Sequence, residues 1–207
     1  MTGTEWWTLP EEVLEIAVEP KCDAPDAGES PRVAVHVCCG PCASAVIERL
    51  ADRWKIDAVW HNPNIHPIEE HERRLESMRI VAERTGTPLV VLEYDVEQWW
   101  ELCAGLEDEP EGGARCEVCF RMRLEMTARW AVAEGVDAIT TTLTISPHKD
   151  AERIHEIGAE VAARHGLRFL AMDFKKGGGF QRSVELSREW DLYRQKYCGC
   201  APAARWG

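Results

Sequence analysis

The chain has 207 residues, 45% of them hydrophobic and 29% charged, so it can bury the core of one large domain without disulfide bonds. Its formal net charge of -12 argues at first against a nucleic-acid partner, because binding phosphates usually needs a surplus of Lys and Arg. It has no apolar run of membrane-spanning length and no signal-peptide pattern at Met1–Pro10, so we expect a cytoplasmic protein with no membrane partner.

The first segment, residues 1–31, holds eight acids, one Lys and four prolines. Such a segment buries little apolar surface, so we expect an acidic N-terminal extension that is partly mobile. Residues 32–207 are expected to form a single α/β catalytic domain that ends in a Cys-Gly-Cys tail.

Short apolar runs typical of buried strands follow this extension, separated by helical patterns that end before Gly86, Gly135 and Gly166. The expected strands are Arg32–Val37, Ile56–Trp60, Leu89–Leu92, Ala138–Thr142 and Arg168–Ala171. Strands that alternate with helices predict a Rossmann-like parallel sheet of about five strands with helices on both faces. Ligands of such sheets bind beyond the carboxyl ends of the strands, near the point where the strand order reverses.

Seven of the nine cysteines fall into three clusters, Cys38-Cys39-Gly40-Pro41-Cys42, Cys116-Glu117-Val118-Cys119 and Cys198-Gly199-Cys200. Thiolates are the ligands of iron-sulfur clusters and of zinc, and in a reducing compartment clustered cysteines favour metal binding or catalysis over disulfides. The first cluster follows the first strand, and the second is expected to open a helix. The third lies on a tail that is free to fold back. Cys22 and Cys103 are expected to be unliganded, with Cys103 in the core.

Two loops and one basic segment carry further candidates. His61, His66 and His148 follow the second and fourth strands and could be proton donors, RNA contacts or ordinary hydrogen-bonded loop residues. Residues 164–197 hold eight Lys or Arg against four acids, with interleaved Phe and Tyr. This segment is either a surface for a nucleic-acid strand or a solvated helix with a basic loop.

Several long strings closely resemble the motifs of the QueH-type, cobalamin-independent epoxyqueuosine reductases. They are Asn62-Pro-Asn-Ile-His-Pro, the segment from Gly105 to Arg121, the segment from Thr140 to Lys149, and Tyr193-Arg-Gln-Lys-Tyr-Cys-Gly-Cys. The resemblance runs from about Val33 to Cys200. It implies a fold of the nucleotide-binding alpha-hydrolase type. It also implies an oxidoreductase that reduces the epoxide of epoxyqueuosine, at the wobble position of tRNA, to give queuosine.

The resemblance also implies roles for the cysteines. Cys38, Cys39, Cys116 and Cys119 look like the four ligands of a 4Fe-4S cluster, and Cys198 and Cys200 look like a redox-active catalytic pair. Removing an epoxide oxygen to leave an alkene takes two electrons and two protons, whereas a cluster usually delivers one electron. A second redox centre or a second delivery of an electron is therefore needed, and the Cys198/Cys200 dithiol could be that centre. Alternatively, an additional mononuclear iron could bind the epoxide oxygen and polarise the carbon-oxygen bond as a Lewis acid, with Cys42 as a candidate ligand together with Cys200. An external electron donor is needed in either case.

Two other functions stay open at this stage. An ATP-dependent tRNA-thiolating enzyme would have a similar sheet and similar cysteine pairs, but it needs a phosphate-binding loop after the first strand, where this chain has Cys38-Cys39-Gly40-Pro41-Cys42. A zinc-bound, non-enzymatic RNA-binding protein would also use paired thiolates. The adjacent Cys38 and Cys39 disfavour zinc, whose usual loops separate the ligands by two to four residues.

Overall fold

The computed structural model describes residues 30–200, so all but the last two residues of the predicted acidic extension, Cys22 included, lie outside this range. Within it, a five-stranded sheet alternates with helices. The strands are β1 (Arg32–Val37), β2 (Lys55–Trp60), β3 (Leu89–Val91), β4 (Ala138–Thr141) and β5 (Arg168–Phe169). The helices are α1 (Gly40–Leu50), α2 (Ile68–Thr85), α3 (Val96–Leu102), α4 (Ala114–Ala133), α5 (Ala151–Arg164) and α6 (Gly179–Glu189), with 3-10 turns η2 (Thr142–Ile145) and η3 (Lys176–Gly178).

The sheet is parallel throughout, in the order β3-β2-β1-β4-β5. Val35 in the central strand pairs with Ala58 on one side and with Thr140 on the other. Both faces of β1 are covered, because Ala34 and His36 on one face are fully buried like Val33, Val35 and Val37 on the other, which explains why apolar and exposed polar residues do not alternate. The predicted Rossmann-like parallel sheet is confirmed.

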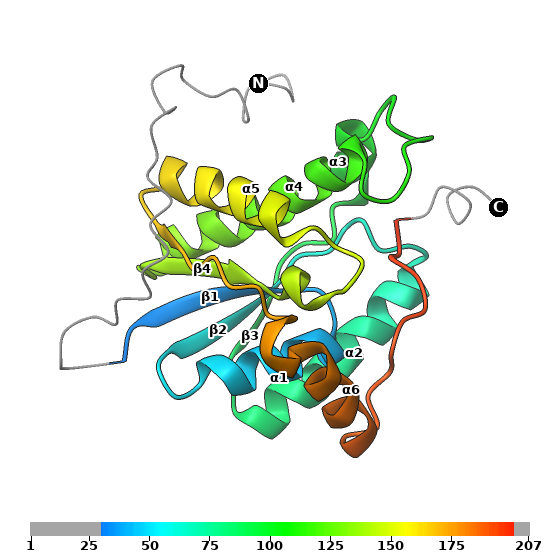
Figure 1. Ribbon diagram of the computed structural model, residues 1–207. Helices are drawn as coiled ribbons and strands as arrows, with labels where there is room; N and C mark the ends of the chain where they lie inside the picture. The colour runs from blue at the N-terminus through cyan, green and yellow to red at the C-terminus, as the bar shows by residue number, and fades with distance from the viewer. Residues whose placement is uncertain (1–29, 201–207) are drawn as a thin grey trace.

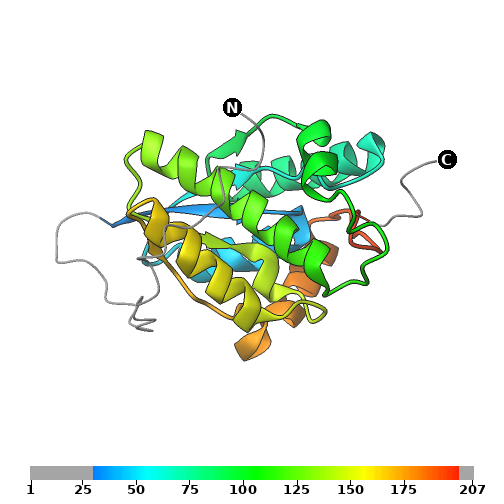
Figure 2. The same ribbon diagram turned by 90° about the horizontal axis from the view of Figure 1, so that it is seen from above.

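Helices cover both faces of this sheet. Figure 1 shows α1, α2 and α6 on one side and α4 and α5 on the other, and Figure 2 shows α4 and α5 lying side by side along their face. Each side has its own apolar core, one containing Trp60, Met78 and Phe174, the other containing Leu124, Ile139 and Ile154. None of the helices in the described range is long and apolar enough to cross a lipid bilayer.

The fourth strand is one residue shorter than its apolar run predicts. The Thr141 hydroxyl accepts a hydrogen bond from the Leu143 backbone N–H at 3.1 Å, which turns the chain into η2. The strand order reverses between β1 and β4, so the loops that leave these two strands diverge at the same edge of the sheet. The cysteines after β1 therefore lie beside the residues after β4.

Candidate metal and redox site

The turn after β1 places two cysteines at the start of α1. Cys39 is the N-cap residue, and its sulfur accepts a hydrogen bond from the Cys42 backbone N–H at 3.4 Å. Gly40 packs so closely against α2 that a Cβ atom would lie 2.4 Å from the Ser77 carbonyl oxygen. Cys38 lies at the reversal point of the sheet, with its sulfur 3.5 Å from the Thr142 hydroxyl. A helix N-terminus and a close backbone contact thus fix this turn.

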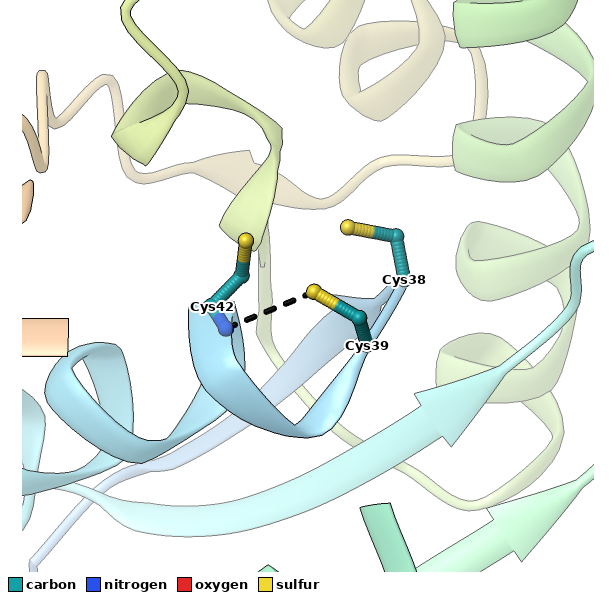
Figure 3. A group of neighbouring side chains, drawn as sticks. All are labelled: Cys38, Cys39 and Cys42. Atoms are coloured by element: carbon teal, nitrogen blue, oxygen red, sulfur yellow. Dashed lines mark hydrogen bonds between the residues drawn. The ribbon is translucent and has the colours of Figure 1, made fainter. Parts of the chain in front are cut away.

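Three thiols meet at this turn. The sulfur atoms of Cys38, Cys39 and Cys42 all lie within 4.8 Å of one another, and Figure 3 shows them gathered at the first turn of α1. The Gln195 side chain also donates to the Cys39 sulfur at 3.3 Å. An all-sulfur donor set of this kind suits soft metal centres such as iron-sulfur clusters or zinc. The group can therefore hold a metal ion or cluster.

Hydrogen bonds among the three thiols give them different pKa values. Hydrogen bonds from Cys39 and Cys42 hold the pKa of Cys38 well below its usual range. The same contacts raise the pKa of Cys42, and the contact with Cys38 raises the pKa of Cys39 to about 12. Cys38 is thus the first of the three to become a thiolate, the form that ligates metals.

Cys116 and Cys119 lie in the first turns of α4, as predicted. The Cys116 sulfur accepts from the Gly112 backbone N–H at 3.2 Å, and the Cys119 sulfur accepts from Arg123 Nη2 at 2.6 Å. Cys116 packs in the same apolar cluster as Cys38, and Cys119 packs with Cys198 and Cys200. The compact three-thiol group includes Cys42 but neither Cys116 nor Cys119. The four-ligand assignment therefore stays a prediction.

The sequence pattern did not identify Arg123, which contacts the proposed ligand Cys119. It is 2% exposed, and its other amino group donates to the Asn62 side-chain oxygen at 3.3 Å. Burial lowers its pKa, but the charges of Cys119, Cys38 and Cys198 outweigh this and keep the guanidinium protonated. Its spacing of four residues from Cys119 on a predicted helix is the signal that could have revealed it.

The C-terminal pair returns to the same region. The sulfur atoms of Cys198 and Cys200 are 3.8 Å apart. The buried Arg74 of α2 donates to the carbonyl oxygens of Cys198 and Tyr197 at 2.8 and 3.0 Å. Gly199 has a φ of +104°, and a Cβ atom there would lie 3.2 Å from Arg74 and Ile65. The residues from Tyr193 to Cys200, here called the C-terminal strap, are thus fixed against α2.

The loop after β4 brings Lys149 to Cys198. Lys149 Nζ is 3.7 Å from the Cys198 sulfur and 3.7 Å from a Glu111 carboxylate oxygen. The hydrogen bond from Cys200, followed by the positive charges of Lys149, Arg123 and Arg74, lowers the pKa of Cys198. Contact with Cys198 raises the pKa of Cys200 instead. Cys198 is therefore the more acidic and more nucleophilic thiol of the pair.

A cavity of about 420 Å³ opens over these groups. Its walls join the turn after β1, the loop after β4 and the C-terminal strap. The lining residues used below are Cys38, Cys42, Arg74, Glu111, Arg123, Thr142, His148, Lys149, Phe180, Arg194, Lys196, Tyr197 and Cys198. Cysteines from two of the three clusters thus line one cavity, beside several cations.

The three candidate histidines differ in burial. His61 and His66 are buried, and burial lowers the pKa of each to about 4. His66 stacks on Trp100 with ring centroids 4.5 Å apart, and its Nδ1 lies 3.2 Å from the Tyr94 hydroxyl. His148 is exposed and lines the cavity. Cys103, expected in the core, is 3% exposed and packs beside Trp99.

The basic segment 164–197 is not one continuous surface. Lys175 and Lys176 pair with Asp173, and Arg182 pairs with Glu48. Arg194 and Lys196 instead line the cavity together with Phe180 and Tyr197. Only the cavity-lining part of the segment combines basic and aromatic side chains around the cysteines.

The chain is similar in sequence to proteins of one known family. The family model described as epoxyqueuosine reductase QueH matches residues 33–205. The chain is 42% identical over 181 residues to the epoxyqueuosine reductase QueH of Streptococcus pyogenes serotype M1, covering 84% of this chain and 71% of that protein. It is 37% identical over 171 residues to the protein of the same name from Thermotoga maritima, covering 81% and 88% of the two chains.

A solved structure shares the fold. It is the U34-tRNA thiolase NcsA from Methanococcus maripaludis with its [4Fe-4S] cluster, with a TM-score of 0.56 and 12% sequence identity. The match covers 84% of this chain and 62% of that one. At this identity the similarity concerns the fold alone. The turn after β1 in the present chain holds three cysteines around one glycine, which leaves no glycine-rich loop for a nucleotide phosphate.

Proposed function

The chain belongs to the epoxyqueuosine reductase QueH family, and from this membership we propose that it reduces the epoxide of epoxyqueuosine at the wobble position of tRNA to the alkene of queuosine. The observation that carries the proposal is a single cavity lined by Cys38, Cys42, Cys198 and Lys149. It brings a metal-binding thiol group and a candidate redox pair to one substrate, as reductive removal of an oxygen requires.

The cofactor that fits these residues is a 4Fe-4S cluster. Cys38, Cys39, Cys116 and Cys119 are the proposed ligands, and Cys42 is the proposed ligand of an additional mononuclear iron. Soft sulfur donors and the positive charge of the buried Arg123 support this assignment, since a cluster with four thiolates is anionic. When bound, such a cluster supplies single electrons.

Cys198 and Cys200 are the proposed redox-active pair. Their sulfur atoms lie 3.8 Å apart beside the cavity, so oxidation of the two thiols to a disulfide releases two electrons and two protons. The epoxide consumes the same two electrons and two protons when both of its carbon-oxygen bonds break, the alkene forms and the oxygen leaves as water. An external electron donor then reduces the disulfide again, with two protons from solvent.

The proposed tRNA contact is the rim of the cavity. Arg194 and Lys196 provide positive charge for phosphate groups, and Phe180 and Tyr197 offer rings on which bases can stack. Tyr197 is 40% exposed, and the guanidinium carbon of Arg74 lies over its ring, 5.3 Å from the ring centre. The net negative charge of the whole chain is therefore compatible with a local RNA surface.

The test is anaerobic incubation of the iron-loaded protein with tRNA carrying epoxyqueuosine and a reductant, followed by mass analysis of the nucleosides. The proposal predicts conversion of epoxyqueuosine to queuosine, with loss of one oxygen. Unchanged epoxyqueuosine with a fully loaded protein would contradict it, and a sulfur-containing nucleoside would favour thiolation instead.

A further inference from the structure

Lys149 is an ammonium group in an unusual place. Its side chain is 13% exposed, and it lines the same cavity as Cys38, Cys42 and Cys198. Removing an ammonium from water costs free energy that ordinary surface lysines avoid, because their charged ends reach solvent. Contacts with Cys198, Glu111 and the Phe120 ring, whose centre lies 5.6 Å from Nζ, offset this cost.

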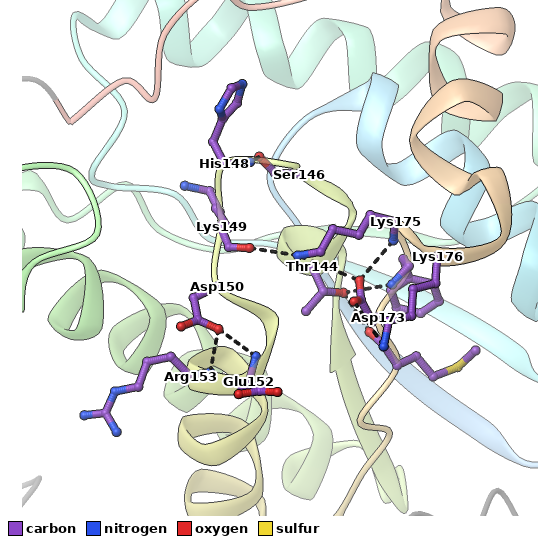
Figure 4. Close-up of polar contacts among 12 residues, drawn as sticks. Thr144, Ser146, His148, Lys149, Asp150, Glu152, Arg153, Asp173, Lys175 and Lys176 are labelled. Carbon is purple, nitrogen blue, oxygen red and sulfur yellow. Dashed lines mark hydrogen bonds and ion pairs between the residues drawn. The ribbon is translucent and has the colours of Figure 1, made fainter.

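The loop after β4 fixes the direction of this side chain. Lys175 Nζ donates to the Lys149 carbonyl oxygen at 2.9 Å, and the neighbouring Asp150 caps α5 through the N–H groups of Glu152 and Arg153. Figure 4 shows the Lys149 carbonyl held by Lys175 on one side of the loop, with the Lys149 side chain leaving on the other side. One contact thus holds the backbone of Lys149 and the other holds the next residue, Asp150, so the backbone from which the side chain leaves is fixed.

Other cations around the cavity are committed elsewhere or lie at its rim. Arg74 donates to Glu70 and to the carbonyl oxygens of the C-terminal strap, and Arg123 donates to Cys119 and Asn62. A guanidinium loses a proton even less readily than an ammonium does. Burial lowers the pKa of Lys149, but the charges of Cys198, Cys119 and Cys116 outweigh this and raise it above its ordinary value, so the group is an ammonium whose proton only a strong base such as an alkoxide takes. Lys196 is exposed. The Lys149 ammonium has three N–H donors. Among residues 30–200 it contacts two acceptors, the Cys198 sulfur and the Glu111 carboxylate, so one N–H remains for a ligand.

We infer that Lys149 is a catalytic residue that binds the epoxide oxygen and protonates it as the carbon-oxygen bond breaks. This inference rests on the proposed function and adds the proton donor to it. Two electrons enter from the reduced site, both carbon-oxygen bonds break and the alkene forms. The oxygen takes one proton from Lys149 and one from solvent and leaves as water, while the two protons that Cys198 and Cys200 release as their disulfide forms return to Lys149 and to solvent.

Negative charge develops on the epoxide oxygen only as the carbon-oxygen bond breaks. The contact with Lys149 therefore stabilises the transition state more than the bound substrate. We expect Lys149→Met to lower kcat about 100- to 1,000-fold while KM for tRNA changes by less than about threefold. Lys149→Arg, which keeps the charge but gives up no proton, should remain strongly impaired. The matched control is Lys176→Met, because the Lys176 side chain is 83% exposed and pairs with Asp173 at 3.9 Å. It should retain wild-type kcat.

A second readout separates catalysis from a structural role. In Lys149→Ala, added methylammonium or ethylammonium should restore turnover with saturation, and iron content and tRNA affinity should match the wild type. Near wild-type kcat in Lys149→Met, or a loss of activity that follows a loss of iron, overturns the inference. So does the absence of rescue by both amines. Failure of the wild type to form queuosine would instead contradict the proposed function itself.

Discussion

Arg123 lies one helical turn after Cys119 on α4, and its Nη2 donates to the Cys119 sulfur at 2.6 Å. Both residues are about 2% exposed, so the positive charge is compensated by sulfur inside the protein instead of by water. Burial raises the pKa of Cys119, while the charge of Arg123 acts in the opposite direction. Burial prevails and the pKa of Cys119 is raised, so Arg123 reduces but does not remove the cost of forming the thiolate that a metal would bind.

Replacing Arg123 with Met should weaken the metal centre. The substitution removes the donor that orients Cys119 and the charge that offsets an anionic cluster, and such supporting contacts typically contribute about 10- to 100-fold in metal affinity or activity. Iron retained against a chelator measures the effect. Arg121→Gln is the matched control, because Arg121 lies on the same helix and pairs with Glu160 away from the cysteines. Equal iron retention in the two variants would refute this role.

Ala at any one of Cys38, Cys39, Cys116 or Cys119 should abolish the cluster colour and the activity together, because each removes a proposed ligand. Cys103→Ala, which alters a buried thiol outside the proposed ligand set, should keep both. Absorption spectra and iron and sulfide contents provide the measurement. An intact cluster in two of the four variants would refute the assignment.

Replacing Cys42 shows whether it binds the cluster or a separate iron. Its sulfur belongs to the compact three-thiol group, yet it is proposed to bind a separate iron. Cys42→Ala should therefore lose part of the iron and keep the acid-labile sulfide. Complete loss of sulfide would make Cys42 a cluster ligand.

Ser at Cys198 or Cys200 should keep the cluster and lose multiple turnover, because one thiol alone cannot form the disulfide that releases two electrons. Product formed per protein in a single incubation and under continuous reduction measures this. Unchanged multiple turnover would show that the pair has another role.

The sheet could be predicted because strands buried on both faces, such as β1 with His36 as its one buried polar residue, leave mainly apolar runs. Sequence reasoning also placed the cysteines at the correct ends of their elements. It could not predict that Arg74 fixes the C-terminal strap, because a long-range contact between α2 and residue 198 leaves no periodic signal. It grouped Cys42 with Cys38 and Cys39 along the chain but assigned it to a second metal, whereas the compact three-thiol arrangement follows from the N-cap geometry of Cys39.

Acid should destabilise the fold through His71. Its Nε2 accepts a hydrogen bond from Trp60 Nε1 at 2.9 Å, and burial lowers its pKa from 6.5 to about 4. Below pH 6.5 the unfolded chain binds a proton that the folded chain does not, so stability is lost as the pH falls from 6.5 to about 4. His71→Gln should reduce this slope by up to about 1.4 kcal/mol per pH unit. Urea unfolding of the metal-free protein at several pH values provides the measurement, and an unchanged slope would contradict the assignment.

The central claim is that the cysteines form a redox centre and not a structural zinc site. The most direct measurement is the iron, acid-labile sulfide and zinc content of the protein purified without oxygen. The account predicts iron together with sulfide in cluster proportions and little zinc. Stoichiometric zinc without acid-labile sulfide would contradict it.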